Sequence, residues 1–449
     1  MPKTSSFNNN LNIGMWNIQG LTEEKTDEHV FKNFVNKLHI VSFVETWNDS
    51  GKSVNNIPSF TCICNSTRKN HRRARRGSGG IAGYVKNCIS KGVSNLSNRH
   101  SEIVWTKLDS KFFSLNRDVF IAVVYFSPEN SSSCTEDINA IYSRLLRNIE
   151  HYSQLGDIVI QGEFNAYTNT VPDFVISDNT EFPRPIDNEY SIDSHISRNN
   201  LDNKPINKSG KLLFDLCKES GIRILNGKTI GDLRGKSTCI TYNGRNVVDY
   251  TLVSCNLLHG IGNFIVNDFT PLSDHCPISC SILTCFQGDN NGMNANLDPM
   301  PGKLIWDEET ISRYNTNNQI IQVKQKLEET AVKILNSILC DTALKSTKFV
   351  KKRMGKRSSK QNKKPWFSDS CHDLYITVQK SCSLVNKFPE NGSHRKAFYS
   401  FRSKFRRKSK HDEKIYRNQI CDKIFQNMKS DAKTFWNLLK MNPLIKLNL

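Results

Sequence analysis

The chain has 449 residues, 37% of them hydrophobic, with 62 Lys+Arg against 43 Asp+Glu and a formal net charge of +19. This length allows two or three domains. Because no run of about 18 apolar residues occurs and the first residues, MPKTSSFNNN, lack the apolar core of a secretion signal, the sequence predicts an intracellular protein without a membrane span.

The positive charge is confined to the C-terminal third. Residues 1–300 contain 30 Lys+Arg and 30 Asp+Glu, whereas residues 301–449 contain 32 and 13, which leaves the whole excess of 19 there. So basic a segment predicts an anionic partner, DNA first and RNA through the tail. The alternative is that its helices only carry charged outer faces. The run KKRMGKRSSKQNKK at 351–364 is typical of a nuclear import signal.

The 14 cysteines form no Cys-x-x-Cys pair and match no common zinc-site spacing. They indicate free thiols in a reducing compartment.

The first half of the chain alternates predicted strands and helices. A strand at 11–16 is followed by Asn17, Thr22 caps the next predicted helix, and a buried strand at 40–44 ends in Glu45. Two neighbouring strands thus each deliver a polar residue at the C-terminal end, where sites gather in open sheets.

A basic run, RKNHRRARR, occupies residues 68–76, where six of nine residues are Lys or Arg. We place it on a loop. It either contacts phosphates, through Arg72, Arg73, Arg75 and Arg76, or is a solvated loop, and the sequence favours neither.

The rest of the chain is organised around the stretch IVIQGEFNA, residues 158–166. A capping box at Ser133 opens the preceding helix, which Gly156 ends. Glu163 and Asn165 then follow the buried strand, two residues apart, so their side chains point the same way out of the sheet edge.

The remaining polar candidates come later in the same half. A polar excursion at 167–208 interrupts the domain, which is more often functional than accidental. The turn Asn243-Gly244 predicts a hairpin whose second strand carries Asp249. Asp274 and His275 lie on the loop entering the last strand. We expect a domain at 1–284, a linker at 285–305 and a basic helical segment at 306–449.

Tyr125, which ends a further strand, completes the set of polar strand-end residues. Hydrolysis of a phosphodiester needs a divalent metal, a base that activates water, and donors to the developing charge. Carboxylates and a histidine supply the first two, and amides and a tyrosine supply the third. Hard oxygen ligands favour Mg²⁺ or Mn²⁺ over zinc.

Six blocks in this order resemble the endonuclease/exonuclease/phosphatase superfamily, which includes pancreatic deoxyribonuclease and abasic-site endonucleases. The blocks are WNIQG at 16–20, VETW at 44–47, VVYFSP at 123–128, GEFNA at 162–166, VVDYTLV at 247–253 and LSDHCPI at 272–278. The resemblance covers residues 8–284. It implies an α/β (α+β) fold, a four-layer α/β/β/α sandwich of two mixed sheets, followed here by a basic helical tail.

Within the superfamily, the chain is most similar to the endonuclease of non-LTR (LINE-type) retrotransposons. The evidence is NKSGKLLFDLC, then RILNGKTIGDLRGKSTCITYNG, and a basic helical segment that begins PWFSDSC. The chain ends about where a reverse transcriptase would begin and has no aromatic-Ala-Asp-Asp motif. It therefore resembles a truncated or separated piece of a retroelement protein.

The resemblance implies a role for each matching residue. Glu45 would bind the metal with Asn17 beside it, and Asp274 would make a second or alternative metal contact. Among the catalytic residues, Tyr125 and Asn165 would hold the phosphate and its transition-state charge. His275 would touch the scissile phosphate and be oriented by Asp249. Glu163 would orient or deprotonate the attacking water. Thr238 matches a residue that faces DNA in some relatives.

Glu163 departs from the family, which has Asp at this position. One methylene shifts a carboxylate by about 1 Å, which can cost on the order of 10²-fold in rate. Three functions follow: a Mg²⁺-dependent endonuclease that nicks DNA to a 3′-hydroxyl and a 5′-phosphate, a weakened nucleic-acid-binding relic, and a phosphatase of small ligands. The basic run and the basic tail argue against the third. No protein partner is predicted.

Overall fold

The computed structural model describes residues 10–48, 55–67, 79–96, 102–128, 136–175, 196–286, 303–305, 348–350, 364–427 and 431. The chain divides into two compact units, one formed by residues 1–289 with 365–449 and the other by residues 290–364. In the second unit, β15 (Lys303–Ile305) pairs antiparallel with β16 (Lys348–Val350). The last helices belong to the first unit.

The first sheet is mixed, since β1 and β2 run parallel and its other pairs are antiparallel. Its strand order is β13 (Ile261–Val266), β14 (Ile278–Ile282), β1 (Leu11–Asn17), β2 (Ile40–Val44), β4 (Ile81–Lys86) and β3 (Phe60–Ser66).

The second sheet has the same character, with β7 and β8 as its parallel pair. Its order is β5 (Val93–Asn95), β6 (Ile103–Leu108), β7 (Asp118–Tyr125), β8 (Gly156–Glu163), β12 (Asp249–Ser254) and β9 (Ile222–Ile224). The shorter elements are β10 (Cys239–Ile240), β11 (Arg245–Asn246), α3 (Ser110–Phe113), η1 (Asn87–Gly92) and η2 (Cys255–Gly260).

The alternation of side chains along β7 shows how the layers form. Ile121 and Val123 face the core between the sheets, whereas Phe120, Ala122 and Val124 face the opposite way. Because successive side chains of a strand point to opposite faces, a strand that is apolar throughout must be covered on both faces.

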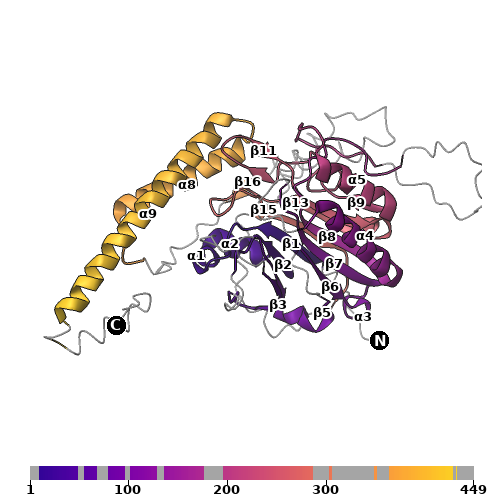
Figure 1. Cartoon of the computed structure of the whole chain (residues 1–449), viewed down its shortest axis with the longest axis horizontal. Coiled ribbons are helices and arrows are strands. Elements are labelled where there is room, and N and C mark those ends of the chain that lie inside the picture. Colours follow the sequence, from indigo (N-terminus) through magenta and orange to yellow (C-terminus); the bar gives the residue numbers. More distant parts are fainter. Residues whose placement is uncertain are drawn as a thin grey trace, which may run out of the picture. The chain divides into compact units, whose positions relative to one another are not determined.

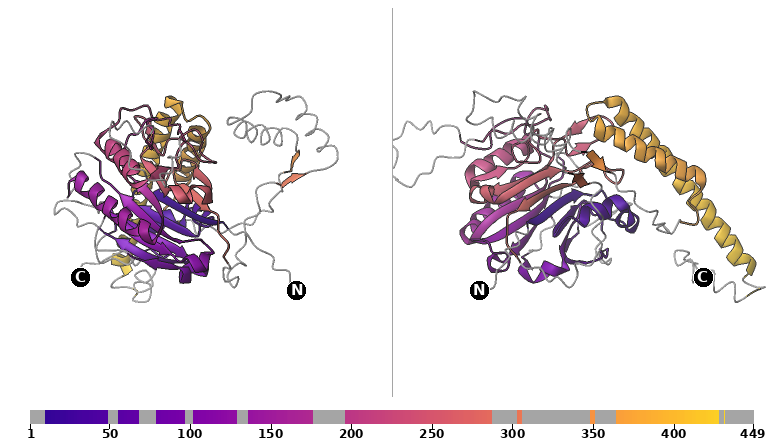
Figure 2. Two further views of the ribbon diagram at one scale, coloured as in Figure 1. Left: turned by 90° about the vertical axis from the view of Figure 1, so that its right-hand side faces the viewer. Right: turned by 180° about the vertical axis from the view of Figure 1, so that it is seen from behind.

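Helices cover the two outer faces. α4 (Ile138–Leu155) and α5 (Lys208–Ser220) pack on the second sheet, and α1 (Glu23–Asp27) with α2 (His29–Val35) lies beside the first. The four-layer α/β/β/α sandwich is therefore confirmed (Figures 1 and 2).

Some local predictions differ from the structure. One helix was predicted after Thr22, but Glu28 adopts an extended conformation, with φ −65° and ψ 137°, and divides it into two. Thr22 does cap the first. Ser133 lies outside the described residues, and Asp137 occupies the N-cap of α4. The cysteines of the described ranges are free thiols.

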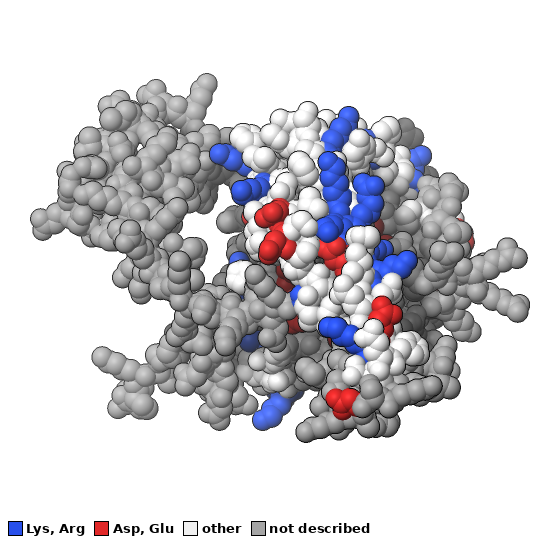
Figure 3. Space-filling view, turned by 90° about the vertical axis from the view of Figure 1, so that its left-hand side faces the viewer, with Lys and Arg blue, Asp and Glu red and all other residues white. Residues whose placement is uncertain are grey.

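Two long helices, α8 (Asp369–Lys387) and α9 (Gly392–Asn427), complete the first unit and pack against each other. Phe398 of α9 is fully buried, with its ring centroid 5.0 Å from that of Phe269. The Asn386 side chain bonds both the backbone N–H and the backbone carbonyl of Phe269. Lys and Arg side chains gather on the face where these helices lie (Figure 3). None of the helices in the described ranges is long and apolar enough to cross a membrane.

We expect Phe398→Ala to lower the free energy of unfolding by about 3 kcal/mol, because it removes a large side chain from a packed interior. The matched control is Phe425→Ala on the same helix, where the ring is 63% exposed and the change should stay within about 0.5 kcal/mol. Urea denaturation measures both. Equal effects would mean that α9 does not pack on the sandwich in solution.

Candidate active site

The pairing of three strands places three candidate side chains in one row. Tyr125 lies opposite Glu163 in the parallel β7–β8 pair, and Glu163 lies opposite Asp249 in the antiparallel β8–β12 pair. In the first sheet, Asn17 ends β1 opposite Val44, and Glu45 follows directly. The two sheets thus present polar residues at one edge, as the sequence predicts.

Glu163 is buried, and two amides hold its carboxylate. Asn17 Nδ2 donates to Oε2 over 2.5 Å, and Asn165 Nδ2 donates to Oε1 over 2.9 Å. Asn165 also donates to the Phe126 carbonyl over 2.8 Å, so both N–H donors of its amide are used within the protein. The longer Glu side chain therefore has a partner for each oxygen.

His275 forms a buried pair with Asp249. Nδ1 of the imidazole lies 2.8 Å from Oδ2 of Asp249, and Nε2 lies 3.9 Å from Oε1 of Glu163. The backbone of His275 is held at both of its polar groups. Trp16 Nε1 donates to the His275 carbonyl over 2.9 Å, and the Ser273 hydroxyl accepts from the His275 N–H over 3.1 Å. The ring is thereby fixed between two carboxylates.

Thr238, which the resemblance relates to DNA contact, is fully buried. Its hydroxyl accepts the backbone N–H groups of Val248 and Asp249, each over 3.0 Å. In the structure Thr238 holds the start of the strand that carries Asp249.

Glu45 and Tyr125 form a second pair beside this cluster, since the tyrosine hydroxyl donates to Oε1 of Glu45 over 2.7 Å. Glu45 and Asn165 both have left-handed backbones, with φ of 53° and 49°. Non-glycine residues rarely adopt this conformation, and it concentrates at functional sites. The turns that leave β2 and β8 are thus shaped to direct these two side chains.

The buried carboxylate and imidazole both bind protons more tightly than usual. Burial raises the pKa of Glu163 to about 8, and the Asp249 and Glu45 carboxylates add to the rise while His275 opposes it. Burial alone would lower the pKa of His275, but the neighbouring Asp249, Cys239 and Glu163 together raise it well above its ordinary range. The imidazolium form of His275 is therefore favoured.

The carboxylates of the cluster offer oxygen ligands to a cation, whereas His275 offers a nitrogen only in its neutral form. Ligand atoms of Glu163, Asp249 and His275 all lie within 4.8 Å of one another. Oδ1 of Asp249 is buried without a hydrogen-bond partner among the described residues. An uncompensated buried carboxylate oxygen is costly, and a divalent cation with a preference for oxygen would satisfy it.

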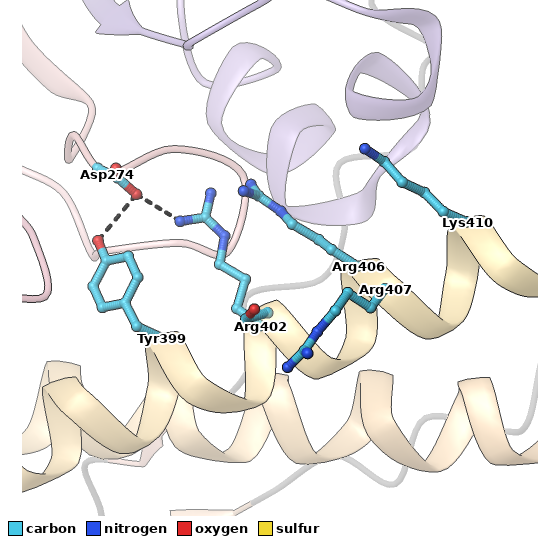
Figure 4. A pocket seen from close by; sticks show the side chains of 7 residues that line it. Asp274, Tyr399, Arg402, Arg406, Arg407 and Lys410 are labelled. Atoms are coloured by element: carbon cyan, nitrogen blue, oxygen red, sulfur yellow. Dashed lines mark hydrogen bonds and ion pairs between the residues drawn. The ribbon is translucent and has the colours of Figure 1, made fainter.

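Asp274, a predicted metal contact, has different neighbours. Its Oδ1 accepts from Arg402 Nη1 over 2.5 Å and from the Tyr399 hydroxyl over 3.0 Å, both on α9 (Figure 4). Oδ2 lies 3.5 Å from Gln19 Nε2. The sequence alone does not identify Arg402 as a partner of Asp274, because the two residues are 128 positions apart. The four arginines of the predicted loop, Arg72, Arg73, Arg75 and Arg76, lie outside the described residues.

No known protein-family model matches the chain, and no curated protein matches it. Among solved structures, the endonuclease domain of TRAS1, a telomere-specific non-LTR retrotransposon, is 13% identical with a TM-score of 0.40, over 61% of this chain and 99% of that one. The 3′-5′ exonuclease NExo from Neisseria meningitidis is 14% identical with a TM-score of 0.39 and the same coverage. The AP endonuclease LMAP from Leishmania major is 13% identical with a TM-score of 0.41, over 61% and 88%. Likeness at this level assigns no role to any residue of this chain.

We expect the free energy of unfolding, measured with a chelator present, to fall as pH rises from 4.5, the ordinary glutamate value, to about 8. Over that window the folded state binds more protons than the unfolded state, because the folded pKa of Glu163 is raised, so stability decreases by up to about 1.4 kcal/mol per pH unit. The raised pKa of His275 acts in the same direction above 6.5.

Glu163→Gln is the control, since it removes only the carboxylate. Denaturation at several pH values should give a shallower decline for this variant. Identical slopes for the two proteins would contradict the raised pKa of Glu163.

Proposed function

We propose that this protein is a metal-dependent DNA endonuclease of retrotransposon origin, which hydrolyses one phosphodiester to a 3′-hydroxyl and a 5′-phosphate. The observation that carries the proposal is the buried cluster in which Glu163 is held by two amides and lies 3.9 Å from a histidine paired with Asp249. A base, a cationic donor and metal-binding oxygens in one place are what phosphodiester hydrolysis requires.

In this reaction Glu163 orients the attacking water and accepts its proton. A general base works best when its pKa is close to the working pH, and burial raises the pKa of Glu163 to about 8. Asn17 and Asn165 fix both oxygens of the carboxylate, which keeps it in one orientation.

His275 carries the positive charge that meets the phosphate. Asp249 holds Nδ1, so the imidazolium presents its Nε2–H toward the cluster. A fixed donor in a buried site stabilises the negative charge that develops on phosphate oxygens more strongly than water can.

The metal would be Mg²⁺ or Mn²⁺, which suits the oxygen donors. Glu45 would hold it with Asn17 beside it, and the carboxylates of Glu163 and Asp249 are also within the cluster. Asp274 is proposed as a further contact through Oδ2, because Arg402 and Tyr399 occupy Oδ1. When bound, such a cation would neutralise charge on the phosphate and make a nearby water more acidic.

The second candidate is a weakened nucleic-acid-binding relic, and the observation that favours it is Glu163 itself in place of the family Asp. The partners found for both of its oxygens support the enzyme, since the turn at Asn165 accommodates the longer side chain. The endonuclease proposal also includes DNA as the substrate, RNA as a ligand of the tail and residence in the nucleus.

We expect metal-dependent nicking of supercoiled plasmid by the wild-type protein and a loss of about 10²-fold or more in Glu45→Ala. Glu163→Asp should lose on the order of 10²-fold, because shortening the side chain pulls the carboxylate about 1 Å from its amide donors. Glu150→Ala, an exposed acid on α4, is the matched control and should retain wild-type activity. The rates of nicking with Mg²⁺, Mn²⁺ or a chelator measure these effects.

The relic hypothesis predicts the opposite effect of Glu163→Asp on nicking. Under it, wild type is inactive and Glu163→Asp restores nicking. That result would contradict the proposal that this chain is an active endonuclease.

A further inference from the structure

A pocket of about 270 Å³ lies between α9 and the loop that carries Asp274. It is lined by Asp274, Tyr399, Arg402, Ser403, Arg406, Arg407 and Lys410. Arg402 points at Asp274 in Figure 4, while Arg406 and Lys410 extend from the helix beside it. We call this set of residues the α9 pocket.

The α9 pocket has more positive than negative charge. Four cationic side chains and one carboxylate line it, and of the four only Arg402 pairs with the carboxylate. Arg406, Arg407 and Lys410 form no ion pair with any residue that the structure describes. Like charges that converge without counterions repel, and an anion placed among them relieves that repulsion.

Lys25 adds a further cation next to the pocket. Its ammonium donates to the carbonyls of Ile18 and Gln19. Burial, together with the nearby Arg402 and Arg406, lowers its pKa to about 7. Burial and Arg402 likewise lower the pKa of Arg406. Nε of Arg402 is buried and has no partner among the described residues.

The pocket adjoins the hydrolytic cluster through two consecutive residues. Asp274 faces the α9 pocket and His275 pairs with Asp249, and the Cα atoms of consecutive residues lie about 3.8 Å apart. Arg402, Arg406 and Lys410 are spaced four residues apart, so they share one side of the helix in steps of about 6 Å. A polyanion that enters the cluster can therefore continue along this side of α9.

We propose that the α9 pocket binds a backbone phosphate of the DNA strand that is being cut, adjacent to the scissile phosphodiester, with Arg406 and Lys410 as the contacts. The inference rests on the proposed function, because it takes the anion to be the flanking part of the same substrate. Arg402 holds Asp274 in place, which leaves Arg406 and Lys410 for the ligand. The helix would thereby set the register of the strand relative to Glu163 and His275.

The test measures DNA binding with a chelator present, so that it does not depend on cleavage. The double variant Arg406→Ala/Lys410→Ala should bind a short DNA duplex about tenfold more weakly at low salt. The slope of log affinity against log salt should fall by about 1, as expected for one lost phosphate contact. The control, Lys414→Ala/Lys423→Ala, removes the same charge from exposed positions of α9 outside the pocket. It should change affinity less than threefold.

A scan of the DNA locates the contact without altering the protein. Replacing one phosphate at a time by an uncharged methylphosphonate should weaken binding by wild type at one position next to the scissile phosphate. That position should lose its effect in Arg406→Ala/Lys410→Ala and keep it in the control. Because wild type alone shows whether such a position exists, the scan can refute the proposal even when the double variant folds poorly.

Several results would overturn the proposal. Equal weakening in both double variants would mean diffuse attraction along α9, and a scan without a sensitive position would mean that no phosphate is seated. Stronger competition by single-stranded RNA than by DNA, or full competition by inorganic phosphate, would assign the pocket to another ligand.

DNA binding with a sensitive position but no nicking would support the pocket and reject the endonuclease.

Discussion

The buried pair between His275 and Asp249 is the constraint on which the rest of the site depends. Asp249 belongs to the second sheet, while His275 lies on the loop that enters β14 of the first, so the pair joins the sheets at the edge where the polar residues gather. The contact of Asn17 with Glu163 joins them again, from β1 to β8. Removing one partner of a buried charge pair commonly costs about 3–5 kcal/mol, so the sheets can separate here only at a high cost.

The two carboxylates of the cluster, Glu163 and Asp249, have different partners. Oδ2 of Asp249 is paired with the His275 imidazole, and the backbone N–H of Asp249 donates to the Thr238 hydroxyl. Glu163 is buried near two other carboxylates, which favours its protonated form, while the hydrogen bond from the Asn17 amide opposes this shift of the pKa. The raised pKa of Glu163 therefore follows from its burial and from its acidic neighbours.

Much of the site could be predicted because its residues follow buried strands. Apolar runs at 40–44 and 158–161 determine where β2 and β8 end, and so where Glu45 and Glu163 lie. Contacts that depend on distant packing left no local pattern: Arg402 reaches Asp274 only because Phe398 is buried against Phe269. The break at Glu28 was hidden for a similar reason, since the apolar spacing of Phe31 and Phe34 fits one helix or two. The length of Glu163 and the nearby Asn165 are evident in the sequence, but the second amide that accommodates Glu163, that of Asn17, belongs to β1 of the other sheet.

The end chemistry of a nick tests the central claim most directly, namely that the cluster around Glu163 hydrolyses a phosphodiester. Plasmid nicked by the wild-type protein with Mg²⁺ would be purified and treated with a DNA ligase that joins only a 3′-hydroxyl to a 5′-phosphate. We expect the nicks to be sealed, and we expect no nicking with a chelator or in Glu163→Ala. Nicks that resist sealing, or that form equally well in Glu163→Ala, would contradict the account.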